Sequence, residues 1–408
     1  MTEPTTYNVA VIGCGYVGYP LALVLAGAGH RVTAVDTDPA VVERILTQAM
    51  LPTEPGIAEL ARTVSETDRL IPSGTVVPAD VYIIAVPTPL DPTGKRADLS
   101  AVKSAAQAIV PILKHGDLVV VESTVPPGTC NHVVAPILAA NGLNVGEDVF
   151  LAHCPERVFP GNSVDELTNV ARVVGGINLS SSAAAIRFYE TFVTAPLSAT
   201  SATTAEISKV MENTYRDVNI ALANQVAAIA RSHGIDPSEP IRIANQHPRV
   251  AYADPGIGVG GHCIPIDPWF LLDDIEDGGV IAAARAINDN QPHRLASLIS
   301  EQVADIESPR IVIVGIAYKP DVVDTRGSPA LAICNLLESA GMNVVVYDPV
   351  VDHPTESLTV VATGTDLIVI LVRHRQVADL LADERGAIGS AMRHNRVIDL
   401  STGTTQDR

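Results

Sequence analysis

The sequence predicts an α/β protein with two Rossmann-like domains joined by a central helical region that contains a long dimerisation helix. Three observations support this prediction. A glycine-rich turn follows the first apolar strand, a second strand–helix–strand unit lies near the C-terminus, and about 30 residues between them lack Pro and Gly. We expect domains over residues 1–200, 201–300 and 301–408.

The first domain opens with a strand, a glycine turn, a helix and a second strand. The apolar run 9–12 is followed by Gly13, Gly15 and Gly18, and the strand 31–35 ends at Asp36. In this context the first glycine makes a tight turn, the second lets the backbone approach a pyrophosphate, and the third lets helix and strand pack closely. Asp36 lies 23 residues after Gly13, where an acid that binds a ribose 2′-OH is expected. No Arg follows Asp36 directly, which favours NAD over NADP.

Further apolar runs at 81–86, 118–121 and 149–152 continue this sheet. Their unbroken apolar character is typical of parallel strands covered on both faces. Turn or polar residues follow each run: Pro87-Thr88-Pro89, Glu122-Ser123-Thr124 and His153-Cys154-Pro155-Glu156. Ligands of open α/β sheets bind beyond the carboxyl ends of the strands, so we expect site residues in these segments.

The stretch 204–233 predicts a single long helix that stops at Gly234. Lys209 and Asn213 are four residues apart and share one face of it. A solvated polar face is the simplest interpretation, but the length of the helix favours a connector or a dimer helix.

The C-terminal part repeats the strand–helix–strand order. Strands are expected at 310–314, 343–347, 367–372 and 397–400, with a helix over 328–340. Ala317-Tyr318-Lys319 replaces the glycine signature, so this half is expected to bind a nucleotide in a different way.

The composition excludes several classes of protein. The chain has 408 residues, 47% of them hydrophobic and 18% charged, which excludes a disordered protein. Its net charge of −19 argues against a nucleic-acid or anionic-membrane partner. Five cysteines without a CxxC pair predict neither a disulfide framework nor a metal site. Without a signal peptide or an apolar run of membrane-spanning length, the expected location is cytoplasmic.

The segment 256–263 carries the strongest sign of chemistry. Four of its first six residues are glycine, which frees the backbone to wrap round a ligand, and Cys263 follows. With Pro265 in a first helical turn, Cys263 would sit at a helix start, which lowers a thiol pKa. Asp267 is close enough to reach the same site. A buried Cys in a turn is the alternative, and Cys154 is the rival nucleophile. A dinucleotide fold with a reactive thiol suggests oxidation of an alcohol through a thiohemiacetal and a thioester to a carboxylate.

Motifs along nearly the whole chain resemble those of the UDP-glucose/GDP-mannose dehydrogenase family. They are GCGYVG (13–18), PTP (87–89), ESTVPPGT (122–129), CPERVFPG (154–161), EISKVMENTYRDVNIALAN (206–224), GIGVGGHCIPIDPWF (256–270) and AYKPDVVDTRGSP (317–329). The resemblance implies NAD-dependent four-electron oxidation of C6 of a nucleotide-linked sugar, as in polysaccharide biosynthesis. It also implies an NAD domain, a homodimer through the 204–233 helix and a UDP-binding domain.

The resemblance also assigns residues to roles. At the catalytic centre it places Cys263, Lys209, Asn213, Asp267, Thr124 and Glu156. Cofactor contacts are implied for Gly13, Gly15, Tyr16, Val17, Gly18, Asp36, Pro87, Thr88, Ser123 and Thr124. Substrate contacts are implied for Glu156, Arg157, Lys209, Asn213, Arg249, Gly258, Gly260, Gly261, Tyr318, Lys319 and Arg326.

Within these assignments Cys263 is the nucleophile, and Lys209 and Asn213 stabilise oxyanions. Asp267 acts in acid–base chemistry or orients Lys209. Thr124 positions a water, Glu156 is the glutamate of the family's Pro-Glu motif, and Arg249 resembles the arginine given by the neighbouring subunit.

Two departures occur in the 317–329 motif, where Val323 and Gly327 replace acids that are usual in the family. The segment GVGGHCI-x-x-DPWF resembles members that act on UDP-N-acetyl-D-mannosamine. UDP-N-acetylglucosamine or UDP-N-acetylgalactosamine is the next alternative as substrate, and then UDP-glucose. A nucleotide-sugar-binding protein without turnover is the non-enzymatic alternative.

Overall fold

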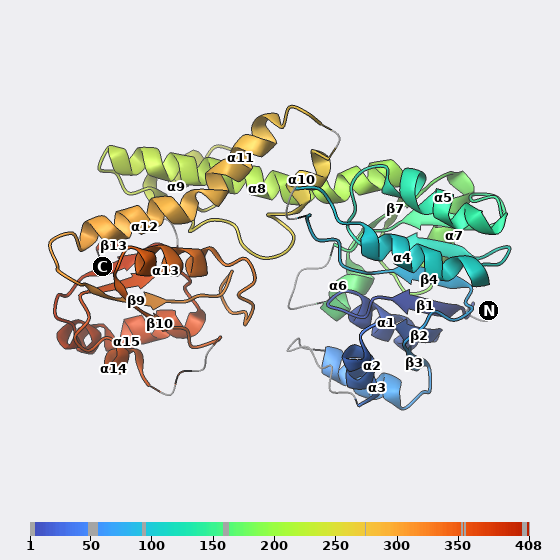
Figure 1. Ribbon diagram of the computed structural model, residues 1–408, viewed down its shortest axis with the longest axis horizontal. Helices are drawn as coiled ribbons and strands as arrows, with labels where there is room; N and C mark the ends of the chain where they lie inside the picture. The colour runs from blue at the N-terminus through green and yellow to red at the C-terminus, as the bar shows by residue number, and fades with distance from the viewer. Residues whose placement is uncertain are drawn as a thin grey trace. The chain divides into compact units, whose positions relative to one another are not determined.

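The computed structural model describes residues 5–47, 56–91, 95–157, 163–273, 275–351, 354, 356–401 and 406–407 (Figure 1). Within it the chain forms two compact units. The first comprises Met1–Met211 with Trp269–Asp274, and the second comprises Glu212–Pro268 with Ile275–Arg408. The end of the predicted CPERVFPG motif, 158–161, lies outside the described residues.

A doubly wound sheet forms the first unit. Its described strands follow the order β3-β2-β1-β4-β5-β6-β7-β8, parallel except for the antiparallel pair β6 and β7. They are β1 (Asn8–Ile12), β2 (Arg31–Val35), β3 (Leu70–Ser73), β4 (Val81–Ile84), β5 (Leu118–Val121), β6 (Phe150–His153), β7 (Arg172–Gly176) and β8 (Leu197–Ser201). The central strands β4 and β5 are buried along their whole length, which explains their unbroken apolar sequences.

Helices cover both faces of this sheet, as expected for a doubly wound fold. They are α1 (Gly18–Gly27), α2 (Pro39–Leu46), α3 (Ile57–Ser65), α4 (Ser100–Ile109), α5 (Ala135–Leu138), α6 (Ser163–Asn169) and α7 (Leu179–Tyr189). The apolar faces of α1, α3 and α7 share one core with the sheet, whereas α4 and α5 pack in a second core on the opposite face. The carboxyl ends of β1, β4 and β5 therefore meet at one edge of the sheet, where the predicted cofactor segments begin.

The second unit contains a smaller sheet in the order β10-β9-β11-β12-β13. Its strands are β9 (Arg310–Val314), β10 (Asn343–Tyr347), β11 (Leu367–Ile370), β12 (Val397–Asp399) and the antiparallel β13 (Gln406–Asp407). Its helices are α9 (Ser238–Ala244), α11 (Gly279–Asp289), α12 (Gln291–Gln302), α13 (Pro329–Ser339), α14 (Leu358–Val361) and α15 (Arg375–Ala391). The helices α12 and α13 cover one face of the sheet, and α14 and α15 cover the other.

The acid at the end of β10 is used differently from its counterpart Asp36. Asp348 is fully buried and accepts hydrogen bonds from the backbone N–H groups of Ile316 and Ala317 and from His374 Nε2, at 2.7, 3.3 and 3.1 Å. Burial alone would raise the pKa of Asp348, but these hydrogen bonds outweigh burial and hold the pKa well below its usual range. The Asp348 carboxylate is thus bonded to groups inside the fold, and is not available to bind a ribose.

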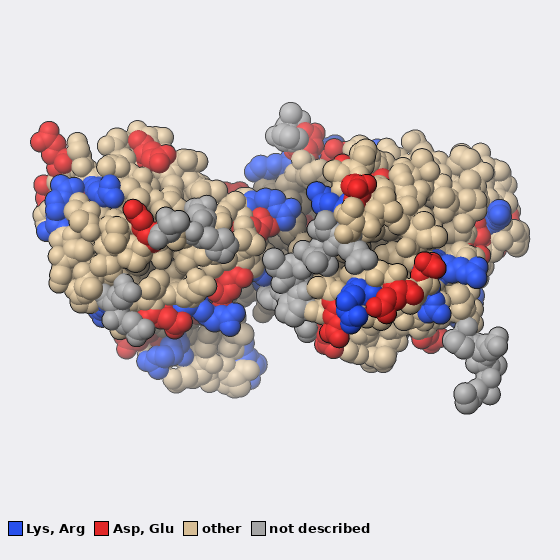
Figure 2. Space-filling view, turned by 90° about the horizontal axis from the view of Figure 1, so that it is seen from below, with Lys and Arg blue, Asp and Glu red and all other residues tan. Residues whose placement is uncertain are grey.

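A continuous helix, α8 (Ala202–Ser232), runs from the first unit into the second (Figure 1). It confirms the predicted long helix to within two residues at each end. Among the described residues no helix combines the length and apolarity that crossing a bilayer requires. On the face shown in Figure 2, basic and acidic side chains are interspersed.

Candidate active site

The turn between β1 and α1 forms a cradle that suits a dinucleotide. Gly13 has φ of +92°, and a Cβ on Gly18 would lie 1.8 Å from the Gly13 carbonyl oxygen, so the turn requires glycine at both positions. A Cβ on Gly15 would meet no atom within 4 Å, which leaves space beside the start of α1. Asp36 accepts a hydrogen bond from the Cys14 backbone N–H at 2.9 Å, which fixes the carboxylate next to the turn. These residues therefore fit the pyrophosphate and the ribose of NAD.

Replacing Asp36 with Ala should weaken the use of NAD and relax the preference for NAD over NADP. The carboxylate offers hydrogen-bond acceptors to the ribose, and its charge would repel a 2′-phosphate. The measurement is kcat/KM with each cofactor. Asp38→Ala is the matched control, because Asp38 is an acid that caps α2 through the Ala40 N–H at 2.8 Å. Equal use of NAD and NADP by the parent protein would contradict the interpretation.

Hydrogen bonds join the segments that follow β4 and β5. The Thr88 hydroxyl donates to the Thr124 carbonyl at 2.7 Å, and the Ser123 hydroxyl donates to the Val86 carbonyl at 2.7 Å. The predicted cofactor residues Thr88, Ser123 and Thr124 thus lie together, while Pro87 is exposed beside them.

A buried ion pair supports this edge of the sheet and excludes the rival nucleophile. Arg172 Nη1 lies 2.7 Å from Glu122 Oε1, and the Tyr189 hydroxyl donates to Glu122 Oε2 at 2.5 Å. Cys154 is fully buried, with its sulfur 4.0 Å from Arg172 Nη1. Burial is the main cause that raises the pKa of Cys154 to about 12, so this thiol stays protonated and out of reach of substrate.

The N-terminal part of α8 is fixed to the ESTVPPGT segment. Glu206 is fully buried and accepts hydrogen bonds from the N–H groups of Gly128 and Cys130, at 2.5 and 2.8 Å. One turn later Lys209 Nζ lies 3.8 Å from Glu156 Oε2, and the two side chains are 11% and 19% exposed. The structure therefore brings these two predicted catalytic residues together within the first unit.

Asn213 and Asp267 form a second pair of predicted residues. The Asn213 Nδ2 donates to Asp267 Oδ2 at 2.6 Å, and Asp267 is buried at the start of α10 (Asp267–Leu271). The sequence-based alternatives for Asp267 were acid–base chemistry and orientation of Lys209. Within the second unit the carboxylate of Asp267 contacts the Asn213 amide.

Polar residues further along α8 have a structural role. Asp217 is buried, and its Oδ1 lies 2.5 Å from Arg285 Nη1. Asn224 accepts from the Gly256 N–H at 2.8 Å, and Gln291 donates to the Gly256 carbonyl at 2.9 Å. Both backbone groups of Gly256 are thus held by buried amides, which fixes the start of the glycine loop.

The glycine loop packs against the 317–329 segment of the same unit. A Cβ on Gly260 would lie 2.7 Å from the Gly327 carbonyl oxygen, and a Cβ on Gly261 would lie 3.1 Å from the Tyr318 ring. The Gly261 N–H donates to the Arg326 carbonyl at 3.1 Å. At Gly327, where the family usually has Glu, φ is +60°, which favours glycine. The glycines therefore permit a close approach between two chain segments.

Cys263 is exposed, whereas the other four cysteines are buried. The prediction that it stands at a helix start with Pro265 in the first helical turn is wrong. A turn over 264–266 intervenes, regular helix begins at Asp267, and Pro268 occupies the first turn. The Cys263 carbonyl accepts from the N–H groups of Ile266 and Asp267, at 3.0 and 2.9 Å, which makes this turn.

The remaining predicted substrate residues lie in several places. Arg326 is held by Asp324 through hydrogen bonds of 2.6–3.0 Å, and Lys319 Nζ is 5.8 Å from the Tyr318 ring centroid. Arg249 is exposed. In the first unit, Arg157 donates to the Ala171 carbonyl at 3.2 Å.

The distinctive Trp269-Phe270 pair divides between core and surface. Phe270 is fully buried, whereas Trp269 is half-buried with Lys95 Nζ 4.0 Å from its ring centroid. This cation–π contact was missed, because no local pattern connects residues so far apart in sequence.

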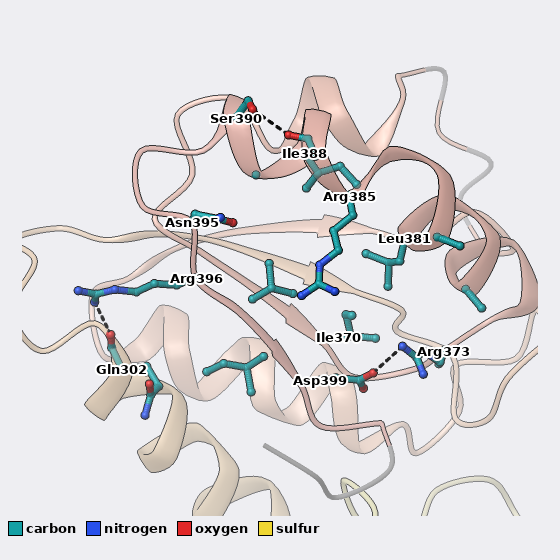
Figure 3. Close-up of a pocket in the computed structure, with 16 residues that line it drawn as sticks. Gln302, Ile370, Arg373, Leu381, Arg385, Ile388, Ser390, Asn395, Arg396 and Asp399 are labelled. Atoms are coloured by element: carbon teal, nitrogen blue, oxygen red, sulfur yellow. Dashed lines mark hydrogen bonds and ion pairs between the residues drawn. The ribbon is translucent and has the colours of Figure 1, made fainter. Parts of the chain in front are cut away.

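A cavity with polar side chains in the second unit does not coincide with any predicted site residue. It has a volume of about 1070 Å³ and lies between α15 and the strands β11 and β12 (Figure 3). Arg385 extends into it, and Arg373 Nη2 pairs with Asp399 Oδ2 at 3.0 Å on its floor. The predicted nucleophile and the predicted oxyanion donors are not among the residues that line it.

Comparisons with known proteins agree with the geometry. Residues 7–193, 203–290 and 312–405 match the NAD binding, central and UDP binding domains of the UDP-glucose/GDP-mannose dehydrogenase family. The chain is 39% identical to a UDP-N-acetyl-D-mannosamine dehydrogenase of Methanococcus aeolicus, over 96% of this chain and 90% of that protein. It is 38% identical to an NDP-N-acetyl-D-galactosaminuronic acid dehydrogenase of Ralstonia nicotianae, over 92% and 93%. The solved UDP-D-ManNAc dehydrogenase of Pyrococcus horikoshii superposes with a TM-score of 0.92 at 38% identity, covering 98% of this chain and 96% of that one.

Proposed function

Because the chain belongs to the UDP-glucose/GDP-mannose dehydrogenase family, we propose that it oxidises C6 of UDP-N-acetyl-D-mannosamine to the carboxylate. The observation that carries this proposal is the exposed thiol of Cys263 directly after the glycine loop. Four residues after Cys263, Asp267 accepts a hydrogen bond from the Asn213 amide. The relatives named for UDP-N-acetyl-D-mannosamine support the sugar.

The glycine turn and Asp36 of the first unit would hold NAD, which would supply the hydride acceptor for the two oxidations. The chain's own residues supply the covalent and electrostatic chemistry. Cys263 attacks the aldehyde carbon to give a thiohemiacetal, and water later hydrolyses the thioester. Lys209 and Asn213, one turn apart on α8, donate to the oxyanions that develop at C6. Their fixed partners Glu156 and Asp267 keep both donors oriented before substrate arrives.

Thr124 and Glu156 lie at the carboxyl ends of neighbouring strands and are proposed to position the hydrolytic water. In the second unit, the side chains of Tyr318, Lys319 and Arg326 and the backbone of Gly258, Gly260 and Gly261 are proposed to hold the nucleotide sugar. Asp324 holds the Arg326 guanidinium through hydrogen bonds of 2.6–3.0 Å.

A substrate panel tests the proposal. UDP-N-acetyl-D-mannosamine, UDP-N-acetylglucosamine, UDP-N-acetylgalactosamine, UDP-glucose and GDP-mannose are compared by kcat/KM with NAD. The mannosamine derivative is expected to lead, with UDP-glucose and GDP-mannose poor because they lack the N-acetyl group. The relative named for N-acetyl-D-galactosaminuronic acid makes UDP-N-acetylgalactosamine the second candidate. Binding without any NADH formation would instead favour a nucleotide-sugar-binding protein.

We also propose a homodimer through α8. Five large apolar side chains of this helix are exposed: Ile207, Met211, Tyr215, Leu222 and Ile229. Their spacing places them within one stripe of the helix surface. A second copy of the chain would cover this stripe in a two-fold symmetric contact, and Arg249 would then complete the partner's site.

Charges introduced into the stripe should separate the dimer. The double variant Met211→Glu and Ile229→Glu places a carboxylate at two positions of the proposed contact, where burial would be costly. Sedimentation velocity is expected to show a monomer, with the parent a dimer. Leu179→Glu changes an exposed apolar residue outside the stripe and should leave the dimer intact. A fully active parent monomer at assay concentration would refute the dimer.

A further inference from the structure

The residue before the nucleophile carries an acid–base group within reach of the thiol. His262 Nδ1 lies 3.7 Å from Cys263 Sγ, a distance at which a thiol can donate a hydrogen bond to an imidazole nitrogen. We propose that His262 is a catalytic base that takes the thiol proton of Cys263 and returns it at the end of turnover. This inference rests on the proposed role of Cys263 as nucleophile.

The neighbours of the pair within the second unit favour a neutral imidazole. His262 is exposed overall, and partial desolvation of its ring is the main cause that lowers its pKa; the Arg326 guanidinium lowers the pKa further, and Asp324 partly opposes both effects. His262 is therefore uncharged at neutral pH, with one ring nitrogen able to accept a proton. A protonated imidazole could not serve, so activity should fall as the pH drops through the pKa of His262.

Three other titratable groups near the pair, Tyr318, Arg326 and Asp324, are poor bases. Burial raises the pKa of Tyr318, which keeps its phenol protonated, and Arg326 holds its proton at all relevant pH values. Both carboxylate oxygens of Asp324 accept hydrogen bonds from the Arg326 guanidinium, and this ion pair lowers the pKa of Asp324. Among these neighbours His262 is the group whose ordinary titration range suits a proton shuttle.

The proton balance is closed. As the sulfur lone pair forms the S–C6 bond, the thiol proton moves to His262 and the carbonyl π electrons move to oxygen. The oxyanion then collapses with loss of hydride from C6, which leaves the thioester. Water adds to the thioester through its oxygen, the C6–S bond breaks, and the two protons of the water pass to solvent as the carboxylate forms. The departing sulfur keeps the bonding pair and recovers the proton from His262. The imidazole is neutral at the start and at the end of the cycle.

Alkylation of Cys263 tests the pair without requiring turnover. Iodoacetamide should label only this thiol in the native full-length protein, because the other four cysteines are buried. The labelling rate, followed by mass spectrometry across pH, is compared for the parent, His262→Gln, His262→Ala and the control His293→Ala. His293 is an exposed histidine on α12 of the same unit.

In the parent and the control, the labelling rate should fall on acidification with an inflection below about 6.5, the ordinary histidine value. In both His262 variants the rate near neutral pH should drop at least about tenfold, with an inflection near the ordinary thiol value of about 8.5. Turnover, measured as kcat/KM, should fall about 10²-fold or more, the range of general-base assistance.

The labelling profile separates a catalytic from a structural role. A parent-like labelling profile in His262→Gln overturns the inference, whether or not turnover falls. Parent-like turnover in that variant overturns it as well. If Cys263→Ser still turned over, Cys263 would not be the nucleophile, and the proposed function would fail. That outcome is independent of the His262→Gln labelling profile, so the two failures can be told apart.

Discussion

Cys263→Ala is expected to abolish carboxylate formation from the nucleotide sugar. Without the sulfur no thiohemiacetal can form, so the second oxidation has no covalent intermediate to act on. The measurement combines NADH formation with the mass of the product. Because the side chain of Cys263 is exposed, its removal should leave the free energy of unfolding close to that of the parent.

The control is Cys334→Ala, which removes a buried thiol from the core between α13 and the second sheet. It should cost some stability but retain turnover. Near-normal carboxylate formation by Cys263→Ala would contradict the assignment. Cys154 would not replace it without a rearrangement, because that sulfur is fully buried beside Arg172.

Lys209→Ala is expected to lower kcat by about 10²–10³, the usual cost of losing one oxyanion donor. The loss should appear in kcat, while NAD binding measured by titration stays at the parent value. Lys209 is only 11% exposed and faces Glu156, so the variant also removes this cation from beside the Glu156 carboxylate. Lys209→Arg keeps the charge and should recover part of the activity.

Lys103→Ala on α4 is the matched control, since it removes an exposed lysine from the same unit. It should leave kcat unchanged. If Lys209→Ala lowers the unfolding temperature but turns over like the parent once folded, the polar face of α8 is structural.

The sequence predicted the central strands because their burial imposes a continuous apolar run. The interior strands β1, β2, β5 and β9 follow their predicted ranges within a residue, and so does β10 at the edge of the second sheet. The strands β3, β7 and β8 were not predicted. β3 and β8 are the edges of their sheet; β3 contains Pro72, and β8 alternates small or apolar residues with polar ones. β7 ends in Gly175 and Gly176, which pack closely against neighbouring chain.

The site was predictable as motifs but not as contacts. The spacing of the glycines and the acid after β2 follow from local requirements of the backbone turn, so they can be recognised in the sequence alone. The bonds that orient the chemistry join residues far apart: Arg172 to Glu122 across 50 residues, and Asn213 to Asp267 across 54. Such pairs depend on tertiary packing, so neither Arg172 nor the amides that hold Gly256 could be recognised from spacing.

The role of Cys154 shows the same limit. Its place after a buried strand and before Pro155-Glu156 resembles that of a site residue, because carboxyl ends of strands carry ligands. Only the buried pair of Glu122 and Arg172 shows that its sulfur faces the interior.

The stoichiometry of the reaction tests the central claim, a four-electron oxidation at C6, most directly. A limiting amount of UDP-N-acetyl-D-mannosamine is consumed to completion by the parent protein with excess NAD, and NADH is counted while the product is weighed by mass spectrometry. The proposed mechanism predicts two NADH per sugar and a uronic acid product. One NADH per sugar with an aldehyde or ketone product would contradict it.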